Sequence, residues 1–465
     1  MTRLLVVGGG ISGLAAAWEA ASAGLDVTVL EASPAVGGKL RVEQLAGIPV
    51  DVGAEALLVT RPEGTELISQ AGLADERIAP LTTAAGIRAG GRTSALPART
   101  LMGVPADLDA LRSSGVLTER GLSAVEAEAG LAPLPPLRED ISVANLVRPR
   151  MGAEVVDRLV EPLLGGVYAG RADALSLRAT LRPLAAALER DGGSVLAAAR
   201  AVAGAGTRSP SAGPVFASLR GGLGRLPQAL VVSGRFAVRT LTTVRSISRT
   251  PTGFALDTGP VPRTERLEGE AVIVATPPGK AARLLRAVAP RAAAELAGIE
   301  TASVAIVSFA YPTPPDAAGS GLLVAASERL AVKGVTLTSA KWPINADGLF
   351  LLRASVGRAG ENLALQLEDE ELIALVRREL RALLDVAGEP VDARVTRWGG
   401  GLPQYGVGHV ERVARIRAAV AEAPGLAICG AALDGIGIPA CIASARAAVA
   451  AVRSAVQAPS DDSAQ

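Results

Sequence analysis

Cysteine, histidine and aromatic residues are scarce in this sequence of 465 residues. It contains two cysteines, Cys429 and Cys441, a single histidine, His409, and 2% aromatic residues. Two thiols and one imidazole exclude a disulfide framework and a four-ligand zinc site, so we expect no metal and a reducing, cytoplasmic compartment. Cys441 is a candidate reactive thiol, but a buried, inert cysteine is the more common case.

An excess of one charge and a long apolar run are also missing. The 47 basic and 46 acidic side chains nearly cancel, which argues against a nucleic-acid partner. We find no stretch of eighteen uncharged apolar residues, so we expect no transmembrane helix. The apolar N-terminus is not expected to be a signal peptide, because three consecutive glycines interrupt it.

The first 31 residues carry the clearest motif. The apolar run Leu4–Val7 predicts a buried strand, and it is followed by the turn Gly8–Gly13, a helix to Ala23 and a second strand, Asp26–Leu30. This is the order of the dinucleotide-binding fingerprint, and Glu31 stands where an acid binds the adenosine ribose. The fingerprint predicts a nucleotide cofactor but does not choose between NAD and FAD.

Two further glycine-containing stretches favour FAD. Gly37-Gly38 follows the ribose acid closely, as in flavoproteins whose chain folds back over the pyrophosphate, and Lys39 there can offset phosphate charge. Gly53-Ala54 offers small residues at which the backbone can approach an extended cofactor.

The rest of the chain alternates between helical and strand-like patterns. We expect a hairpin at 87–92, helices over 107–205 with a buried face at 155–164, and a flexible connector at 203–213. Two consecutive strands are expected at 238–241 and 243–247, followed by strands at 253–257, 271–276, 301–311, 321–325 and 349–356. A helix is expected at 363–387, a loop at 398–409, and a glycine turn before a final helix at 443–456.

Eight stretches resemble the flavin-dependent porphyrinogen oxidases of haem synthesis, within the amine oxidase and phytoene desaturase superfamily. They are VVGGGISGLAAA (6–17), EASPAVGGK (31–39), DVGAEALL (51–58), EPLLGGVYAG (161–170), SLRGGLGRLPQAL (218–230), VIVATPP (272–278), RWGGGLPQYGVGH (397–409) and LDGIGIPACI (433–442). The first two belong to the whole superfamily, whereas EPLLGGVYAG, LPQYGVGH and GIGIPACI are particular to the porphyrinogen oxidases.

The resemblance implies an α/β fold in three parts. Residues 1–75, 205–280 and 400–457 would form a discontinuous Rossmann-like FAD-binding domain, and residues 76–103 and 281–399 a mixed α+β substrate domain. Residues 104–204 would form a helical domain similar to the membrane-attaching module of some relatives, and residues 458–465 a disordered tail.

The resemblance also implies the site residues. The expected contacts to FAD are Gly8, Gly9, Gly10, Ile11, Ser12, Gly13, Glu31, Ala32, Lys39, Gly53, Ala54, Glu55, Ala56, Val244, Trp398, Ile436, Gly437 and Ile438. The expected substrate contacts are Leu163, Gly166 and Leu323, which would enclose the macrocycle. The propionates of the substrate also need cations, and for this reason rather than from the resemblance Arg99 is expected to bind a carboxylate. Arg61, Lys341 and Arg178 are further candidates for carboxylate binding, although surface solvation is the commoner role for any one of them.

The implied substrate is coproporphyrinogen III or protoporphyrinogen IX, oxidised with molecular oxygen. Ser320 stands where some relatives have an aromatic residue, which makes the cavity roomier and favours coproporphyrinogen III. We expect no catalytic side chain, and we expect His409 to make a structural hydrogen bond.

Several alternatives remain open from the sequence. These are an amine oxidase, a carotenoid-type desaturase, and a flavin-binding scaffold or haem-pathway assembly partner without turnover. The expected state is a monomer or homodimer, cytoplasmic or peripheral at the membrane, in transient contact with other haem-pathway enzymes such as ferrochelatase.

Overall fold

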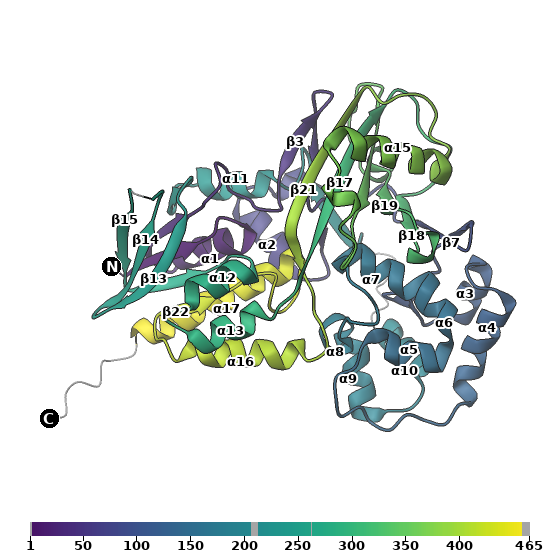
Figure 1. Cartoon of the computed structure of the whole chain (residues 1–465), viewed down its shortest axis with the longest axis horizontal. Helices are drawn as coiled ribbons and strands as arrows, with labels where there is room; N and C mark the ends of the chain where they lie inside the picture. The colour runs from purple at the N-terminus through teal and green to yellow at the C-terminus, as the bar shows by residue number, and fades with distance from the viewer. Residues whose placement is uncertain (1, 206–212, 262, 458–465) are drawn as a thin grey trace.

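A five-stranded parallel sheet forms one end of the molecule, at the left of Figure 1. The computed structural model describes residues 2–205, 213–261 and 263–457, so most of the predicted connector and the whole predicted tail lie outside the described residues. The strand order is β12 (Ala237–Arg239), β2 (Asp26–Leu30), β1 (Arg3–Val7), β16 (Ala271–Val274) and β22 (Leu426–Ile428). All four pairings are parallel, so the carboxyl ends of the strands share one edge.

Helices cover both faces of this sheet, which explains the unbroken apolar strands. Leu4 and Val6 pack in a cluster with α1 (Ile11–Ser22) and α17 (Ile438–Gln457). Leu5 and Val7 point to the other face, against α12 (Pro278–Leu285), α13 (Pro290–Ala297) and α16 (His409–Ala421). The predicted strand–turn–helix–strand order of the first 31 residues is confirmed.

The two strands expected at 238–241 and 243–247 belong to different sheets. The first, β12, pairs with β2, whereas β13 (Val244–Thr250) forms an antiparallel sheet with β14 (Gly253–Thr258) and β15 (Glu265–Gly269). The chain turns between them at Leu241, which has a φ of +53° and donates a backbone hydrogen bond to Ser33 O. Both expected strands therefore exist, but they belong to different sheets.

A seven-stranded sheet forms the centre of the molecule. Its order is β21 (Asp392–Pro403), β17 (Thr301–Tyr311), β20 (Phe350–Val356), β19 (Val332–Thr336), β18 (Gly321–Val324), β7 (Gly86–Ala89) and β8 (Arg92–Ala95). The face that carries Leu322, Val335 and Ala354 packs on α15 (Asp369–Leu384). The alternation of side chains places Leu323 and Arg353 on the opposite, inner face.

Two predicted boundaries near the C-terminus were wrong. The expected loop at 398–409 is half strand, because β21 continues to Pro403 and pairs with β17 across a bulge between Ala302 and Val304. Its glycine triplet hides the alternating pattern of a strand. The last helix, α17, begins at Ile438, five residues earlier than expected, directly after the glycine turn.

Helices α3 to α10 gather at the lower right of Figure 1 and enclose a hydrophobic cluster of their own. They are α3 (Leu108–Ser114), α4 (Glu119–Glu126), α5 (Val143–Met151), α6 (Ala153–Val155), α7 (Glu161–Tyr168), α8 (Leu177–Thr180), α9 (Arg182–Asp191) and α10 (Val195–Ala205). A π-helical turn, Val156–Val160, joins α6 to α7 just before Pro162, whose missing N–H interrupts the regular hydrogen bonds. α7 lies against β18 and β19 and so brings this part of the chain to the central sheet.

The remaining elements connect these parts. They are β3 (Val42–Leu45), β4 (Ile48–Asp51), β5 (Leu57–Leu58), α2 (Pro62–Gln70), β6 (Arg77–Ile78), β9 (Thr100–Leu101), β10 (Val104–Pro105), β11 (Phe216–Leu219), α11 (Arg225–Val232) and α14 (Thr338–Lys341).

In the described part of the chain, one helix, α17, is long and apolar enough to cross a membrane by length and composition, and 56% of its most apolar window is buried inside the fold. It packs on α1, α2 and β22. Among the described residues, no group of three or more His, Cys, Asp and Glu side chains is placed to hold a metal ion.

The buried Glu128–Arg150 pair provides a test of the helical part. Glu128 is fully buried, binds the Arg150 guanidinium at 2.7 Å and accepts the N–H of Val195, at the start of α10, at 2.8 Å. Glu128→Ala should lower the free energy of unfolding by about 3–5 kcal/mol, because it leaves a buried cation unpaired. Urea unfolding followed by circular dichroism measures this.

The matched control is Glu126→Ala, two residues away. Glu126 makes an ion pair with Arg112 at the surface, and its loss should cost less than about 1 kcal/mol. Equal losses for the two variants would contradict the assignment of Glu128 as a buried anchor.

Candidate functional site

The first glycine turn lies at the carboxyl edge of the parallel sheet. Gly8 has a φ of +108°, which side-chain-bearing residues rarely adopt. A Cβ on Gly13 would lie 1.9 Å from the carbonyl oxygen of Gly8, so only glycine allows α1 to start this close to β1. A Cβ on Gly10 would meet no atom within 4 Å. Gly8 and Gly13 therefore shape the turn, whereas Gly10 leaves open space at the helix start, where a dinucleotide pyrophosphate binds.

Glu31 is held at this turn by hydrogen bonds. Its carboxylate accepts the backbone N–H of Gly9 at 2.6 Å and the backbone N–H and hydroxyl of Ser33 at 2.8 and 2.7 Å. The fingerprint places the ribose of a bound dinucleotide at this acid.

Ala32 and Val244 flank the same place. Ala32 is exposed directly after Glu31. Val244 starts β13 two residues after Thr242, whose N–H donates to the carbonyl oxygen of Glu31 at 2.8 Å.

The second glycine pair folds back onto the first turn. Gly37 N donates to Gly9 O at 2.8 Å, and Gly37 forms an isolated parallel bridge with Gly10. A Cβ on Gly38 would lie 3.3 Å from the Cα of Gly10. Two turns separated by almost thirty residues in sequence thus share one backbone surface.

Lys39 connects the second glycine pair to β21 and to the stretch Gly53–Ala54. The Lys39 ammonium donates to the carbonyl oxygen of Gly401 on β21, and burial lowers the pKa of Lys39. Its own carbonyl oxygen accepts the N–H of Ala54 at 3.0 Å, and a Cβ on Gly53 would lie 2.0 Å from that oxygen.

Trp398 completes this contact. The same Cβ on Gly53 would lie 3.2 Å from the Trp398 ring, and the indole N–H donates to Val52 O at 2.9 Å. Arg41 stacks over the ring with its guanidinium carbon 5.7 Å from the centroid.

The start of α17 closes the site from the other end of the chain. Gly437 is exposed directly before the helix, and its carbonyl oxygen accepts the N–H of Cys441 at 3.0 Å. The Cys441 thiol interacts with Ser12 and Lys39, so the first turn of α17 lies beside both glycine turns. Burial raises the pKa of Cys441, which agrees with an inert thiol.

The structure thus brings most of the predicted cofactor contacts together around one open edge. A chain of backbone and side-chain contacts connects the residues of this edge with one another. They are Gly8, Gly13, Glu31, Gly37, Lys39, Gly53, Ala54, Trp398, Gly437 and Cys441. Close backbone approaches, open space at Gly10 and a buried lysine are features that fit an extended dinucleotide cofactor. Ile11, Ala56, Ile436 and Ile438 lie within the same segments.

The predicted substrate contacts Gly166 and Leu323 meet. A Cβ on Gly166 of α7 would lie 3.2 Å from the Leu323 side chain on the inner face of the central sheet. Gly166 is exposed and Leu163 half-buried on the same helix, whereas Leu164 is fully buried. Ser320 Oγ donates a hydrogen bond to Ala84 O at 2.9 Å, so the hydroxyl directly before β18 has a partner within the protein.

The candidate cations differ in their surroundings. Arg61 pairs with Glu63 at 2.8 Å, and Arg178 donates to both Glu189 and Glu411. The Arg99 side chain is 63% exposed, with Asp107 3.9 Å away. Of these three, Arg99 has the weakest acidic partner.

A buried charge network is the main feature that the sequence analysis missed. Glu55 lies between Lys341, at 2.5 Å, and Arg353, at 3.0 Å. Burial would raise the pKa of Glu55, but the charges of Arg353 and Lys341 hold it below its ordinary value. Arg353 also donates to the carbonyl oxygens of Asp51 and Gly53, at 3.2 and 2.8 Å. The sequence did contain a sign of this network, because Arg353 is a charged residue within the otherwise apolar strand FLLRASV.

A second buried cation was also missed. Lys333 on β19 is 4% exposed, and burial, together with the charge of Arg358, lowers the pKa of Lys333 to about 7. The lysine within the apolar stretch AVKGV was the signal in this case.

His409 makes a structural hydrogen bond, as predicted. It begins α16, its Nε2 lies 3.0 Å from Leu433 O, and its ring stacks on Tyr405 at a centroid distance of 4.1 Å. Tyr405 contacts Tyr168 of α7 and donates its hydroxyl to Ala431 O. The motif LPQYGVGH therefore ties the helical part to the turn before α17.

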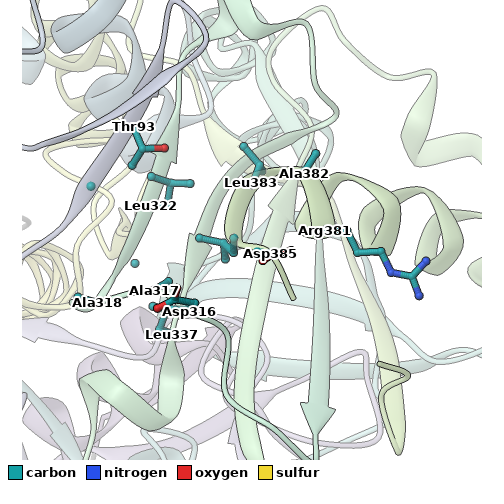
Figure 2. A pocket seen from close by; sticks show the side chains of 13 residues that line it. Thr93, Asp316, Ala317, Ala318, Leu322, Leu337, Arg381, Ala382, Leu383 and Asp385 are labelled. Carbon is teal, nitrogen blue, oxygen red and sulfur yellow. The ribbon is translucent and has the colours of Figure 1, made fainter. Parts of the chain in front are cut away.

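A cavity of about 600 Å³ lies away from these residues. Figure 2 shows it between Leu322 and Thr93 on one side and Leu383 on the other, near the end of α15. No predicted site residue is among the side chains that line it.

Comparisons with known proteins find relatives along almost the whole chain. The model of the family described as flavin containing amine oxidoreductase matches residues 11–453. Coproporphyrinogen III oxidase of Mycobacterium tuberculosis is 39% identical over 462 residues, which cover 97% of this chain and 98% of that protein. Coproporphyrinogen III oxidase of Bacillus subtilis (strain 168) is 31% identical, over 96% and 97% of the two chains.

A solved structure is similar over almost the whole chain. A protein from Exiguobacterium sp. 255-15, whose name places it with the protoporphyrinogen oxidases, superposes with a TM-score of 0.85. It is 32% identical, over 97% of this chain and 98% of that one.

The open space at Gly10 yields a prediction. Gly10 has extended backbone angles, φ −72° and ψ 175°, that valine tolerates, so Gly10→Val should fold normally yet purify without bound cofactor. Absorbance near 450 nm and the melting temperature measure the two properties. Gly130→Val, at another glycine with no atom near its Cβ, is the control and should retain the colour. A coloured Gly10→Val protein would contradict the placement of the cofactor.

The buried imidazole yields a second prediction. Burial lowers the pKa of His409 below its ordinary value of 6.5, so the unfolded chain takes up this proton before the folded one. The stability that His409 contributes should therefore be present above about pH 6.5 and be lost as the pH falls below it. The difference in unfolding free energy between the wild type and His409→Gln should shrink between pH 7.5 and 5.5. Because the chain has one histidine, parallel curves would rule this out.

Proposed function

The chain belongs to the flavin-containing amine oxidoreductases, among the porphyrinogen oxidases of haem synthesis, and on that premise we propose that it oxidises coproporphyrinogen III to coproporphyrin III. The observation that carries the proposal is the near-full-length similarity to two relatives of that name, at 39% and 31% identity. We propose FAD as the flavin, because the ribose acid Glu31 and the paired glycine turns suit a dinucleotide.

The proposed reaction removes six hydrogen atoms. Three molecules of oxygen accept them and leave as three molecules of hydrogen peroxide, which balances the conversion of porphyrinogen to porphyrin. Bound flavin supplies the two-electron redox chemistry in each of the three rounds.

In this proposal the chain's own residues bind the substrate, orient it and exclude water from it. Gly166 and Leu323, which lie against each other, and Leu163 on α7 would form an apolar surface for the macrocycle. Arg99, the least neutralised of the candidate cations, would bind a propionate at the solvent side. No side chain is assigned as acid or base, since the aromatic product provides the driving force.

The residues around Leu323 support the larger, four-carboxylate substrate. Ser320 stands where some relatives have an aromatic residue. Gly334 and Ser355 pair beside Leu323 on the inner face of the central sheet. Small and polar side chains here leave more room than an aromatic lining would. Protoporphyrinogen IX is the second candidate, favoured by the 32% identical structure from Exiguobacterium and its name.

The cellular setting stays a proposal. Two cysteines in 465 residues suit a reducing compartment, so we place the protein in the cytoplasm or peripherally at its membrane. A monomer or homodimer that passes its product to another haem-pathway enzyme, such as a ferrochelatase, fits the same setting.

A fluorescence assay tests the function. The purified flavoprotein is mixed in air with coproporphyrinogen III, with protoporphyrinogen IX or with a primary amine, and porphyrin fluorescence or peroxide is followed. We expect the highest kcat/KM for coproporphyrinogen III, with three peroxides per porphyrin. The flavin-free Gly10→Val protein is the control for non-enzymatic oxidation. Rates equal to that control with every porphyrinogen would disprove the function, and faster protoporphyrinogen turnover would select the second candidate.

A further inference from the structure

Lys333, on β19, carries a buried amine that the proposed function does not use. The residue is 4% exposed, and among the described residues no carboxylate or other acceptor forms an ion pair or a hydrogen bond with the amine. A buried lysine normally has such a partner. The Lys333 Nζ is nevertheless not among the fully enclosed polar atoms of the described chain, so it keeps some accessible surface.

A bulge in β19 turns Lys333 toward the inner face of the central sheet. The bulge lies between Val332 and Gly334, which makes Lys333 the extra residue of the strand. Val332 and Val335 both belong to the hydrophobic cluster that packs on α15. Lys333 and Gly334 lie between these two valines, and a Cβ on Gly334 would lie 3.6 Å from the Leu323 side chain on the inner face. The bulge thus places Lys333 beside Gly334 on that face.

The charges near Lys333 agree with this direction. Glu379 of α15, behind the other face, accepts the N–H of Val332 at 2.8 Å but makes no ion pair with Lys333. The charge that does act on Lys333 is Arg358. The residue after Arg358 donates its backbone N–H to Ala169 O, directly after α7, at 2.6 Å. The amine therefore faces α7 rather than α15.

This position is next to the proposed surface for the macrocycle. Gly334 pairs with Leu323, and a Cβ on Gly166 of α7 would lie 3.2 Å from the Leu323 side chain. α7 contacts both β18 and β19. Lys333, the neighbour of Gly334, thus lies at the border of the apolar surface that Leu163, Gly166 and Leu323 would form.

The surrounding charges keep the amine largely neutral. β18 has no ionisable side chain, and the ionisable groups of the other segments around Lys333 are Glu161, Tyr168, Arg171, Arg353, Arg358, Glu361 and Glu379. Glu161 and Glu361 both pair with Arg171, and Glu379 accepts backbone N–H groups. No acid is left to stabilise an ammonium, so burial and the charge of Arg358 lower the pKa of Lys333 to about 7.

The proposed reaction needs an acceptor for protons. Each round removes two hydrogen atoms, one as a hydride from a meso carbon and one as a proton from a pyrrole nitrogen. Loss of the hydride leaves a positive charge that is shared with the pyrrole nitrogens, which makes their N–H groups acidic. Aromatisation drives the overall reaction, but a base within reach of the macrocycle makes each proton transfer faster.

We propose that the neutral Lys333 amine is the base that takes this proton from the macrocycle. The proposal rests on the porphyrinogen oxidase function given above and adds one catalytic residue to it. The Nζ lone pair forms a new N–H bond as the pyrrole N–H bond breaks, and the ammonium returns its proton to water before the next round. Three hydrides and three protons leave in three rounds, which matches the three molecules of peroxide formed from oxygen.

The test is Lys333→Met, which removes the amine and keeps the length of the side chain. The kcat with coproporphyrinogen III should fall about 100-fold, because a general base is lost, while the Kd of the holoprotein for coproporphyrin III stays within about twofold. The melting temperature should not fall, because an amine without a partner leaves the interior. A lysine with a merely structural role would lower the melting temperature instead.

The pH profile is the second measurement. In wild type, kcat/KM should fall as the pH is lowered through about 7, because the amine becomes protonated and can no longer accept a proton. The residual kcat/KM of Lys333→Met should lack this fall. A fall at the same pH in both proteins assigns the titration to another group and overturns the proposal.

The matched control is Lys280→Met. Lys280 is exposed on α12, far from the central sheet in sequence, and the substitution is chemically the same. It should leave kcat, Kd, melting temperature and pH profile unchanged.

The remaining outcomes separate the two proposals. Turnover by wild type with a kcat for Lys333→Met within twofold overturns the assignment of Lys333 alone. If the variant instead binds coproporphyrin III more weakly, binds its tetramethyl ester as wild type does and keeps its kcat, Lys333 binds a carboxylate and is not the base. Absence of turnover by wild type in the same assay disproves the function, and the assignment of the base falls with it.

Discussion

The backbone contact between two glycine turns is the constraint on which the rest of the structure depends. Gly37 N donates to Gly9 O, and Gly37 bridges Gly10, so the chain after the ribose acid must return to the start of α1. That return carries Lys39 to β21 and places Gly53 against Trp398, which joins the parallel sheet to the central sheet. A side chain at Gly53 would break this arrangement, because its Cβ would lie 2.0 Å from Lys39 O.

The parts of the fold that the sequence predicts well are those in which local pattern and burial agree. Leu4–Val7 and Ala271–Val274 are apolar throughout because helices cover both faces, and each was recognisable as a buried parallel strand. β21 was missed because its glycine triplet shows no alternation, although its pairing with β17 makes it a full strand. That pairing is long-range and leaves no local trace in the sequence.

The candidate site shows the same division. The glycine turns and Glu31 follow a motif whose spacing is fixed by the ligand, so their positions could be predicted. Glu55 is almost three hundred residues from Arg353 and from Lys341 in the sequence. It meets them only because β20 and α14 pack against the segment after β4. The family resemblance predicted Glu55 as a cofactor contact. It did not predict the ion pairs of its carboxylate, which depend on those two distant cations.

The last element of the chain has a consequence for how the protein is made. β22 is an edge strand of the parallel sheet, and α17 packs on α1, so the N-terminal nucleotide fold stays unfinished until residues near 457 have been synthesised. During translation the first glycine turn leaves the ribosome hundreds of residues before its covering helix. The candidate cofactor site is therefore complete only when almost the whole chain has been synthesised, and until then the apolar face of α1 lacks the cover of α17.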